Sequence, residues 1–359
     1  MNHPAIGQSI HDLDTPALIL DLDASEKNIR HLAAFFADRP AQLRPHFKNH
    51  KCTELARRQL EAGSAVGMTC ANVTEAEALG RAGIDDILIA NQVLGQGKVR
   101  RLVDLALTRK MSVAVDDFSQ AEGISAAASA AGATVGLLVE VDTGMGRCGV
   151  PPGEPALALA KQVVDLPGTE LRGLQAYEGH CTYIDDLAER TEKARLALSP
   201  AVETRHLLEQ NGLPVGCISG CSSSTAKISG IMEGITEVQA GSYATMDWRY
   251  NQLVPEFDIA LAVLATVISY RSDRAVLDVG VKTVGAEFGL PRIKEAPTAE
   301  IPFFVAEEHC IVKQVPRWHV GETVHVYASH TCTTCNLHPQ IFVHQNEQVV
   351  DVWKTDGRG

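Results

Sequence analysis

The sequence has no hydrophobic run that approaches the roughly 18 residues needed to span a bilayer. The segment Met1 to Thr15 is polar and contains no apolar signal segment. Low-complexity tracts, blocks of like charge and short internal repeats are also missing. These absences argue against a membrane-spanning, secreted or disordered chain, and we expect a soluble, cytoplasmic globular protein.

Basic residues are fewer than acidic residues in this sequence. The sequence has 32 Lys and Arg residues against 44 Asp and Glu residues, which gives a formal net charge of −12 and a pI near 5.5. Nucleic acids and anionic membrane surfaces would not be attracted to such a protein overall. We expect neither as a partner, although a local basic pocket for a small anion is compatible with this charge.

The nine cysteines are an odd number, and they are spread over 359 residues without the framework of a small disulfide-linked scaffold. We expect reduced thiols, most of them in the core. Cys332 and Cys335 form a C-x-x-C spacing, but no second such pair supports a structural zinc site. With 45% hydrophobic and 21% charged residues, the chain can bury a large core, and we expect one large domain and a smaller one.

Short β-rich runs alternate with helical stretches from residue 42 to about 245, which is typical of a parallel sheet with crossover helices. The runs are Gln42 to His46, Ala65 to Thr69, Asp86 to Ala90, Met111 to Val115, Thr134 to Val141, Gly173 to Tyr177, Gly216 to Ser219 and Glu237 to Ala240. The helices are Thr53 to Ala62, Thr74 to Ala82, Val99 to Thr108, Ser119 to Ala131, Glu154 to Val164 and Leu187 to Asn211. The pattern predicts a (β/α)8 barrel over 15–253, with its chemistry at the carboxyl ends of the strands.

After about residue 254 the pattern changes to β-rich runs that lack intervening helices. They include Ile259 to Tyr270, Ala275 to Val279, Glu322 to Tyr327 and Gln340 to His344. This predicts a second, mainly antiparallel β domain over 254–359, with which residues 1–14 can also pack.

The segment 44–51 places Lys48 where an extended run ends and a helical pattern begins. A lysine held at the mouth of a barrel strand can lower its pKa and form a Schiff base with an aldehyde cofactor. A basic surface loop is the plainer alternative, because most lysines are solvated.

Two later runs end in polar segments. The fifth run ends in 141–149, where glycines allow a sharp turn and Arg147 could offer its planar fork to a phenolate or carboxylate oxygen. The sixth ends in 175–183, which holds Tyr177, His180 and Tyr183, side chains that exchange protons or form hydrogen bonds. Packing for Tyr177 and a loop position for His180 are the alternatives.

The seventh run opens into the hydroxyl-rich turn 219–225, and the eighth ends in 239–243. A turn rich in hydroxyls and free main-chain amides can hold a phosphate. Barrel phosphate sites are often formed by the loops after strands seven and eight, so the two weak signals support each other.

The segment 329–338 of the β domain contains His330 and Cys332. We expect it to be extended, so that residues i and i+2 point the same way and both side chains could bind one divalent metal.

These segments together resemble the fold-type III pyridoxal phosphate enzymes, specifically the D-threonine aldolase and D-serine dehydratase group related to alanine racemase. The resemblance runs from about Asp14 to Trp353 and includes Arg-Pro-His-x-Lys, Gly-Arg-Cys-Gly, Gln-Ala-Gly-Ser-Tyr with Met246-Asp247, and His-x-Cys. It implies that pyridoxal 5'-phosphate is bound by Lys48, Arg147, Tyr177, Ser224, Thr225, Gln239, Gly241 and Ser242. It also implies that His330 and Cys332 bind a divalent metal, that Lys48, His180 and Tyr183 act in catalysis, and that the protein is a homodimer.

Two positions depart from the aldolase pattern. Cys332 stands where the aldolases have an aspartate, and Tyr183 where they have a histidine that can take the substrate's hydroxyl proton. Thiolate ligation favours zinc over manganese, and tyrosine is a poorer base than histidine at neutral pH. Both departures favour dehydration, while the rest of the loop and Met246-Asp247 look like the aldolases.

The resemblance therefore implies a lyase for D-3-hydroxy amino acids. We expect dehydration and deamination of D-serine, D-threonine or 3-hydroxy-D-aspartate to a 2-oxo acid and ammonia. The first alternative is retro-aldol cleavage to glycine and an aldehyde. An amino acid racemase and a non-catalytic pyridoxal phosphate carrier are the others; carriers lack a second domain, which argues against that alternative. A role for Arg249 in binding a second carboxylate and a surface role are both open.

Overall fold

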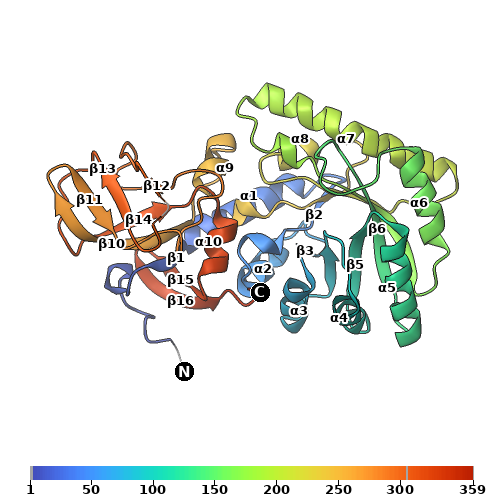
Figure 1. Ribbon diagram of the computed structural model, residues 1–359, viewed down its shortest axis with the longest axis horizontal. Coiled ribbons are helices and arrows are strands. Elements are labelled where there is room, and N and C mark those ends of the chain that lie inside the picture. The colour runs from blue at the N-terminus through green and yellow to red at the C-terminus, as the bar shows by residue number, and fades with distance from the viewer. Residues whose placement is uncertain (1–2, 305, 359) are drawn as a thin grey trace. The chain divides into compact units, whose positions relative to one another are not determined.

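The computed structural model describes residues 3–304 and 306–358 (Figure 1). The described chain divides into two compact units. The barrel unit comprises 32–48 and 56–241, and the β unit comprises the described parts of 1–31, 49–55 and 242–358. The domain boundaries predicted from the sequence stay a prediction. Among the described residues, no helix is both long and apolar enough to cross a membrane.

The barrel unit contains one sheet of eight parallel strands. They are β2 (Gln42–Leu43), β3 (Met68–Cys70), β4 (Asp86–Ile89), β5 (Lys110–Val115), β6 (Val135–Val141), β7 (Thr169–Ala176), β8 (Cys217–Gly220) and β9 (Glu237–Val238). The order in the sheet is β2-β9-β8-β7-β6-β5-β4-β3. Isolated bridges join Leu43 to Ala65 and His46 to Thr69, so that the chain around β2 also pairs with the chain around β3 and the sheet closes. The predicted barrel is confirmed, with each strand within a few residues of its predicted place.

Helices follow most of the strands and lie outside the sheet (Figure 1). They are α2 (Thr53–Glu61), α3 (Val73–Arg81), α4 (Gln96–Ala106), α5 (Phe118–Ala131), α6 (Glu154–Val164), α7 (Leu187–Gln210) and α8 (Ala226–Ser229). Local chemistry sets their ends, as α5 shows: the Asp117 side chain accepts the Ser119 N–H, and Gly132 ends the helix with φ 69°. All seven residues of β6 are buried, as expected for a parallel strand covered on both faces.

The β unit is built on a second sheet, with strand order β12-β14-β10-β1-β15-β16 and β11 and β13 attached to one side. Its strands are β1 (Ala17–Asp21), β10 (Leu261–Arg271), β11 (Arg274–Leu277), β12 (Arg292–Ile293), β13 (Cys310–Lys313), β14 (Thr323–Tyr327), β15 (Gln340–Gln345) and β16 (Gln348–Lys354). Its short helices are α9 (Trp248–Leu253) and α10 (Thr331–Leu337), and α1 (Leu22–Phe36) follows β1. All pairings except β1 with β15 are antiparallel, so the predicted antiparallel domain is confirmed.

One local prediction was wrong. The segment after His330 is the helix α10, whereas we expected an extended chain. His330 is the residue before the helix, with extended backbone angles, and Cys332 lies in the first turn. The Thr334 hydroxyl donates to the His330 carbonyl and accepts the Gly285 N–H, contacts that hold the helical turn.

Candidate functional site

Lys48 lies just past the carboxyl end of the first barrel strand. Pairing with the last strand continues beyond β2, because the His46 N–H donates to the Ala240 carbonyl at 3.1 Å. Lys48 then enters the short 3-10 helix Phe47–Asn49. Its side chain is half-buried, and its Nζ has no hydrogen-bond or ion-pair partner within the described chain. An amine held in this way is available to a carbonyl group.

Arg147 stands on the loop after β6, and main-chain hydrogen bonds shape that loop. The Asp142 carboxylate accepts the N–H groups of Gly144 at 2.9 Å and Gly146 at 3.1 Å. Both glycines have positive φ, 100° and 65°, which side-chain-bearing residues rarely adopt. The Arg147 guanidinium lies 5.5 Å from the centre of the Tyr177 ring and makes no hydrogen bond or ion pair with any described residue.

The loop after β7 carries the two predicted proton-transfer residues. His180 is exposed in the 3-10 helix Gly179–Cys181, and its ring nitrogens have no partner among the residues that the structure describes. A Cβ at Gly144 would lie 3.7 Å from the His180 ring, so the ring covers the glycine of the Arg147 loop. Tyr183 is half-buried on the same loop. Thus Arg147, Tyr177 and His180 come together at the carboxyl end of the barrel.

The turn after β8 buries its hydroxyl groups. Ser222, Ser223, Ser224 and Thr225 are each at most 6% exposed. The Ser222 and Ser224 hydroxyls are 3.1 Å apart, and the Ser224 hydroxyl donates to the Thr182 carbonyl. The main-chain N–H groups of Ser224 and Thr225 have no partner in the described part of the chain. Buried amides are nearly always hydrogen-bonded, so this turn is suited to an anion with several acceptor oxygens.

Gln239 is held at the end of β9 by neutral groups. Its side-chain amide donates to the Gln175 carbonyl oxygen at 2.9 Å and to the Ser219 hydroxyl at 2.8 Å. Gly241 ends the barrel unit and Ser242 begins the β unit. Because Gln239 carries no charge, it can offer only a hydrogen bond to a ligand atom.

In the β unit, His330 and Cys332 come together with a carboxylate behind the histidine. His330 Nδ1 lies 2.7 Å from Asp247 Oδ2. Burial alone would lower the pKa of His330, but Cys332 and Asp247 raise it well above its usual value. Tyr250 and Phe288 pack against the ring at centroid distances of 5.6 and 5.0 Å.

Sequence reasoning assigned no role to Asn49 or Asp247. The Asn49 side-chain amide donates to the Thr331 hydroxyl at 2.7 Å and to the Ser242 hydroxyl at 3.2 Å, and it lies 3.7 Å from Cys332 Sγ. Asp247 is 1% exposed and orients His330, as carboxylates do behind many metal-binding histidines. Two features of the sequence point to these residues. Asn49 directly follows Lys48, and Asp247 belongs to the Met246-Asp247 part of the family resemblance.

The residues fit the cofactor and the metal that the resemblance implies. An unpartnered lysine amine, an unpartnered arginine and buried main-chain amides suit the aldehyde, phenolate and phosphate of pyridoxal phosphate. One imidazole and one thiol with an outer carboxylate suit a divalent metal. Among the described residues there is no group of three or more His, Cys, Asp or Glu side chains arranged for a metal.

Residues 20–247 match the family described as "Alanine racemase, N-terminal domain", and residues 260–344 match "Putative serine dehydratase domain". A D-threonine aldolase from Arthrobacter sp is 39% identical over 98% of this chain and 95% of that protein. A D-threo-3-hydroxyaspartate dehydratase from Delftia sp. (strain HT23) is 28% identical over 95% of this chain and 97% of that protein. The crystal structure of D-threonine aldolase from Filomicrobium marinum has a TM-score of 0.95 and 36% identity, covering 99% of this chain and 98% of that one.

Proposed function

Because this chain belongs to the alanine racemase N-terminal domain family, in its D-threonine aldolase and D-serine dehydratase group, we propose that it is a lyase that cleaves D-3-hydroxy amino acids to glycine and an aldehyde. The group supports a pyridoxal phosphate-dependent lyase of small D-amino acids. The choice of Cα–Cβ cleavage rests on His180, an unpartnered histidine at the carboxyl end of the barrel beside the Arg147 loop. Zinc, the homodimer and a cytoplasmic location stay predictions.

In this proposal the barrel unit binds the cofactor. Lys48 would hold it covalently, and Arg147, beside Tyr177, would hydrogen bond to its ring oxygen. The 222–225 turn and Gly241 would bind its phosphate; the same role for Ser242 stays a prediction. The Gln239 amide donates its two N–H groups to Gln175 and Ser219, so its carbonyl oxygen would accept a hydrogen bond from a protonated ring nitrogen without adding charge. When bound, pyridoxal phosphate supplies an electron sink for negative charge at Cα, and the metal supplies a Lewis acid for the β-oxygen.

His180 takes the proton from the substrate's β-hydroxyl as the Cα–Cβ bond breaks. The β-carbon leaves as an aldehyde, and the Cα of the departing glycine receives a proton. A neutral imidazole can accept this proton near pH 7, whereas a tyrosine hydroxyl cannot without help. The expectation from the sequence was dehydration, because Cys332 and Tyr183 depart from the aldolase pattern. The closeness of the His180 ring to Gly144 of the Arg147 loop supports the cleavage proposal instead.

Dehydration is the second candidate, and Cys332 is the observation that favours it. Its thiol and the His330 imidazole would hold a divalent metal, which supplies a Lewis acid for a leaving hydroxyl. Loss of water followed by hydrolysis would give a 2-oxo acid and ammonia in place of glycine and aldehyde.

Product analysis separates the two reactions. Purified protein with pyridoxal phosphate and zinc or manganese is given D-threonine, and we expect glycine and acetaldehyde in equal amounts. Stoichiometric 2-oxobutanoate and ammonia without glycine would overturn the cleavage proposal in favour of dehydration. Failure of both products, tested also with 3-hydroxy-D-aspartate and D-serine, would overturn the lyase assignment.

The His180→Gln variant tests the base. We expect kcat for cleavage to fall by about 10² to 10⁴-fold, the usual contribution of a positioned proton acceptor. Exchange of the glycine Cα proton with deuterated water needs no β-hydroxyl base and should continue. His206→Gln, an exposed histidine on α7, is the matched control. Unchanged cleavage in His180→Gln would assign the base to another residue, and Tyr183→Phe is then the variant that tests Tyr183.

A further inference from the structure

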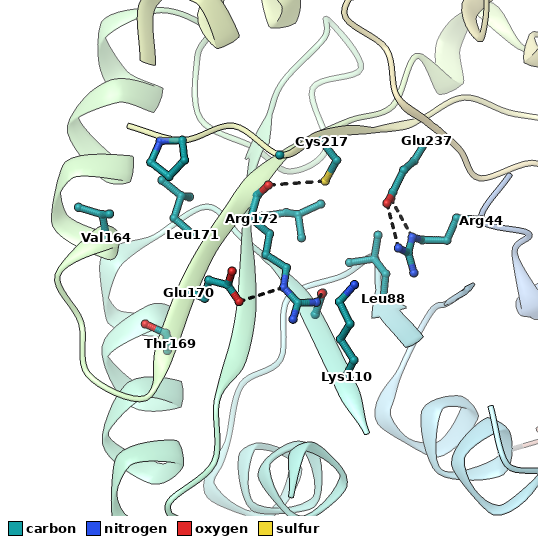
Figure 2. A pocket seen from close by; sticks show the side chains of 14 residues that line it. Arg44, Leu88, Lys110, Val164, Thr169, Glu170, Leu171, Arg172, Cys217 and Glu237 are labelled. Carbon is teal, nitrogen blue, oxygen red and sulfur yellow. Dashed lines mark hydrogen bonds and ion pairs between the residues drawn. The ribbon is translucent and has the colours of Figure 1, made fainter. Parts of the chain in front are cut away.

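The amino-terminal end of the barrel contains a cavity of about 580 Å³, which is not used in the proposed reaction (Figure 2). Its lining includes the first residues of β5, β8 and β9 and the start of β7, at the opposite strand ends from Arg147 and His180. Leu88, Leu138, Val164 and Leu171 give it an apolar wall. Small-molecule sites usually have volumes of roughly 300 to 1,000 Å³ and combine apolar walls with a few polar groups.

A β-bulge directs Arg172 into this cavity. In the pairing of β6 with β7, Leu137 is opposite Leu171 and Leu138 is opposite Gly173, so Arg172 is the extra residue. A Cβ at Gly136 would lie 2.5 Å from the Arg172 side chain, so only glycine leaves room for the arginine there. Bulges near barrel rims and binding sites commonly redirect one side chain.

The Arg172 guanidinium has no close carboxylate partner among the described residues. Its Nη1 donates to the Ser112 hydroxyl at 2.6 Å, its Nε reaches Glu170 only at 3.5 Å, and its Nη2 has no partner within the described ranges. The Glu170 side chain is 60% exposed. By contrast, Arg44 in the same lining donates to both oxygens of Glu237 at 2.8 and 2.9 Å. A long ion pair with an exposed carboxylate, such as Arg172–Glu170, contributes at most about 1 kcal/mol, so a ligand anion can replace Glu170 at little cost.

We propose that this cavity binds a small monocarboxylate with a compact apolar body. The carboxylate accepts two N–H groups from the planar fork of Arg172, and the apolar body lies against Leu138 and Leu171. A single negative charge fits because Arg44 and Lys110 are already matched by Glu237 and Asp86. Charge pairs at this end of a barrel commonly serve stability alone, and that is the competing explanation.

Fluorine NMR of 4-(trifluoromethyl)benzoate with the full chain, loaded with pyridoxal phosphate, tests the site. We expect the fluorine resonance of the benzoate to broaden saturably as protein is added. The neutral 4-(trifluoromethyl)benzamide should bind at least about tenfold more weakly because it lacks the charge. Glu170→Gln removes the competing carboxylate and should tighten benzoate binding by about two- to fivefold. A purely structural Arg172 would not give that gain.

Arg172→Gln should weaken benzoate binding at least about tenfold. Gly136→Ala places a methyl group where the guanidinium stem lies and should also weaken binding, with the charge retained. Arg195→Gln on α7, an exposed arginine paired with Glu192, is the control and should bind as wild type does. Any of three results would overturn the proposal. They are equal affinity for the benzoate and the benzamide, an unchanged benzoate affinity in Glu170→Gln, and competition between the benzoate and free pyridoxal phosphate.

Discussion

Arg44 and Lys110 at the amino-terminal end of the barrel strands differ from Lys48 and Arg147 at the carboxyl end in how their charges are paired. At the amino-terminal end, Arg44 makes ion pairs with Glu237 at 2.8 Å and Asp86 at 2.7 Å, and Lys110 also pairs with Asp86. At the carboxyl end, the Lys48 amine and the Arg147 guanidinium make no hydrogen bond or ion pair with any described residue. Carboxylates there are occupied otherwise, as Asp142 is by main-chain N–H groups.

The difference separates cations that stabilise the fold from cations that a ligand can reach. Arg44 belongs to the first kind, and Lys48, Arg147 and, at the amino-terminal end, Arg172 belong to the second. Burial alone would lower the pKa of Arg44, but Glu237 and Asp86 raise it well above its usual value, so the buried guanidinium stays charged. Unmatched cations at the other end contribute nothing comparable to stability and are free to bind an aldehyde or an anion. The comparison predicts that catalytic variants at one end and stability variants at the other will show separable effects.

Lys48→Ala should have the largest effect, and it should be on activity. We expect kcat to fall by about 10⁴-fold, the upper end of what one proton-transferring side chain contributes. Borohydride reduction followed by peptide mass analysis should find the cofactor on Lys48 in the wild type and nowhere in the variant. Lys98→Ala, an exposed lysine on α4, is the control. Cofactor retained covalently by Lys48→Ala would remove Lys48 as the anchor.

Arg44→Met should have the next largest effect, on stability. Removing one member of a buried charge group leaves Glu237 and Asp86 without their partner, which typically costs about 3 to 5 kcal/mol. Urea unfolding of Arg44→Met and of Arg195→Met measures the difference. The exposed Arg195–Glu192 pair should contribute about 1 kcal/mol or less. Equal losses in the two variants would show that the amino-terminal ion pairs do not stabilise the barrel.

The barrel could be predicted because its strands are short apolar runs between polar turns, and its helices carry clear end signals such as Gly132 after α5. The strand β1 could not, because its partners β10 and β15 lie more than two hundred residues away in the chain. The helix α10 was missed since its Thr-Cys-Thr-Thr-Cys sequence has low helix propensity, and tertiary hydrogen bonds such as Gly285 to Thr334 override that propensity.

The candidate site could be predicted only in part, because sequence patterns show local features and not contacts between residues far apart in the chain. Loops that follow barrel strands share one end by topology, so Arg147, Tyr177 and His180 could be placed there from strand counting. Asn49 and Asp247 form hydrogen bonds to Thr331 and His330, far along the chain, and no local pattern marks such pairs. The bulge at Arg172 was equally hidden, because register is set by pairing and not by composition.

The smallest predicted effect concerns pH and the amino-terminal ion pairs. Burial would raise the pKa of Asp86, but Arg44 and Lys110 outweigh burial and hold that pKa below its usual value. A carboxyl with a lower pKa in the folded than in the unfolded state gives stability that is full above the unfolded pKa of about 3.9. That stability is lost as the pH falls through the folded pKa.

We therefore expect Asp86→Asn to unfold more easily than wild type at pH 7, by about 2 kcal/mol, the scale of a hydrogen bond to a charged group. Urea titrations at pH 7, 5 and 4 and at lower pH should show this gap shrinking only below about pH 4. Asp104→Asn, on an exposed turn of α4, is the control for the loss of a carboxylate at the surface. A gap for Asp86→Asn that stayed constant into acid would mean that the side chain stabilises the barrel by its shape and neutral hydrogen bonds. The contrast between matched charges at one end and unmatched charges at the other would then have no energetic basis at Asp86.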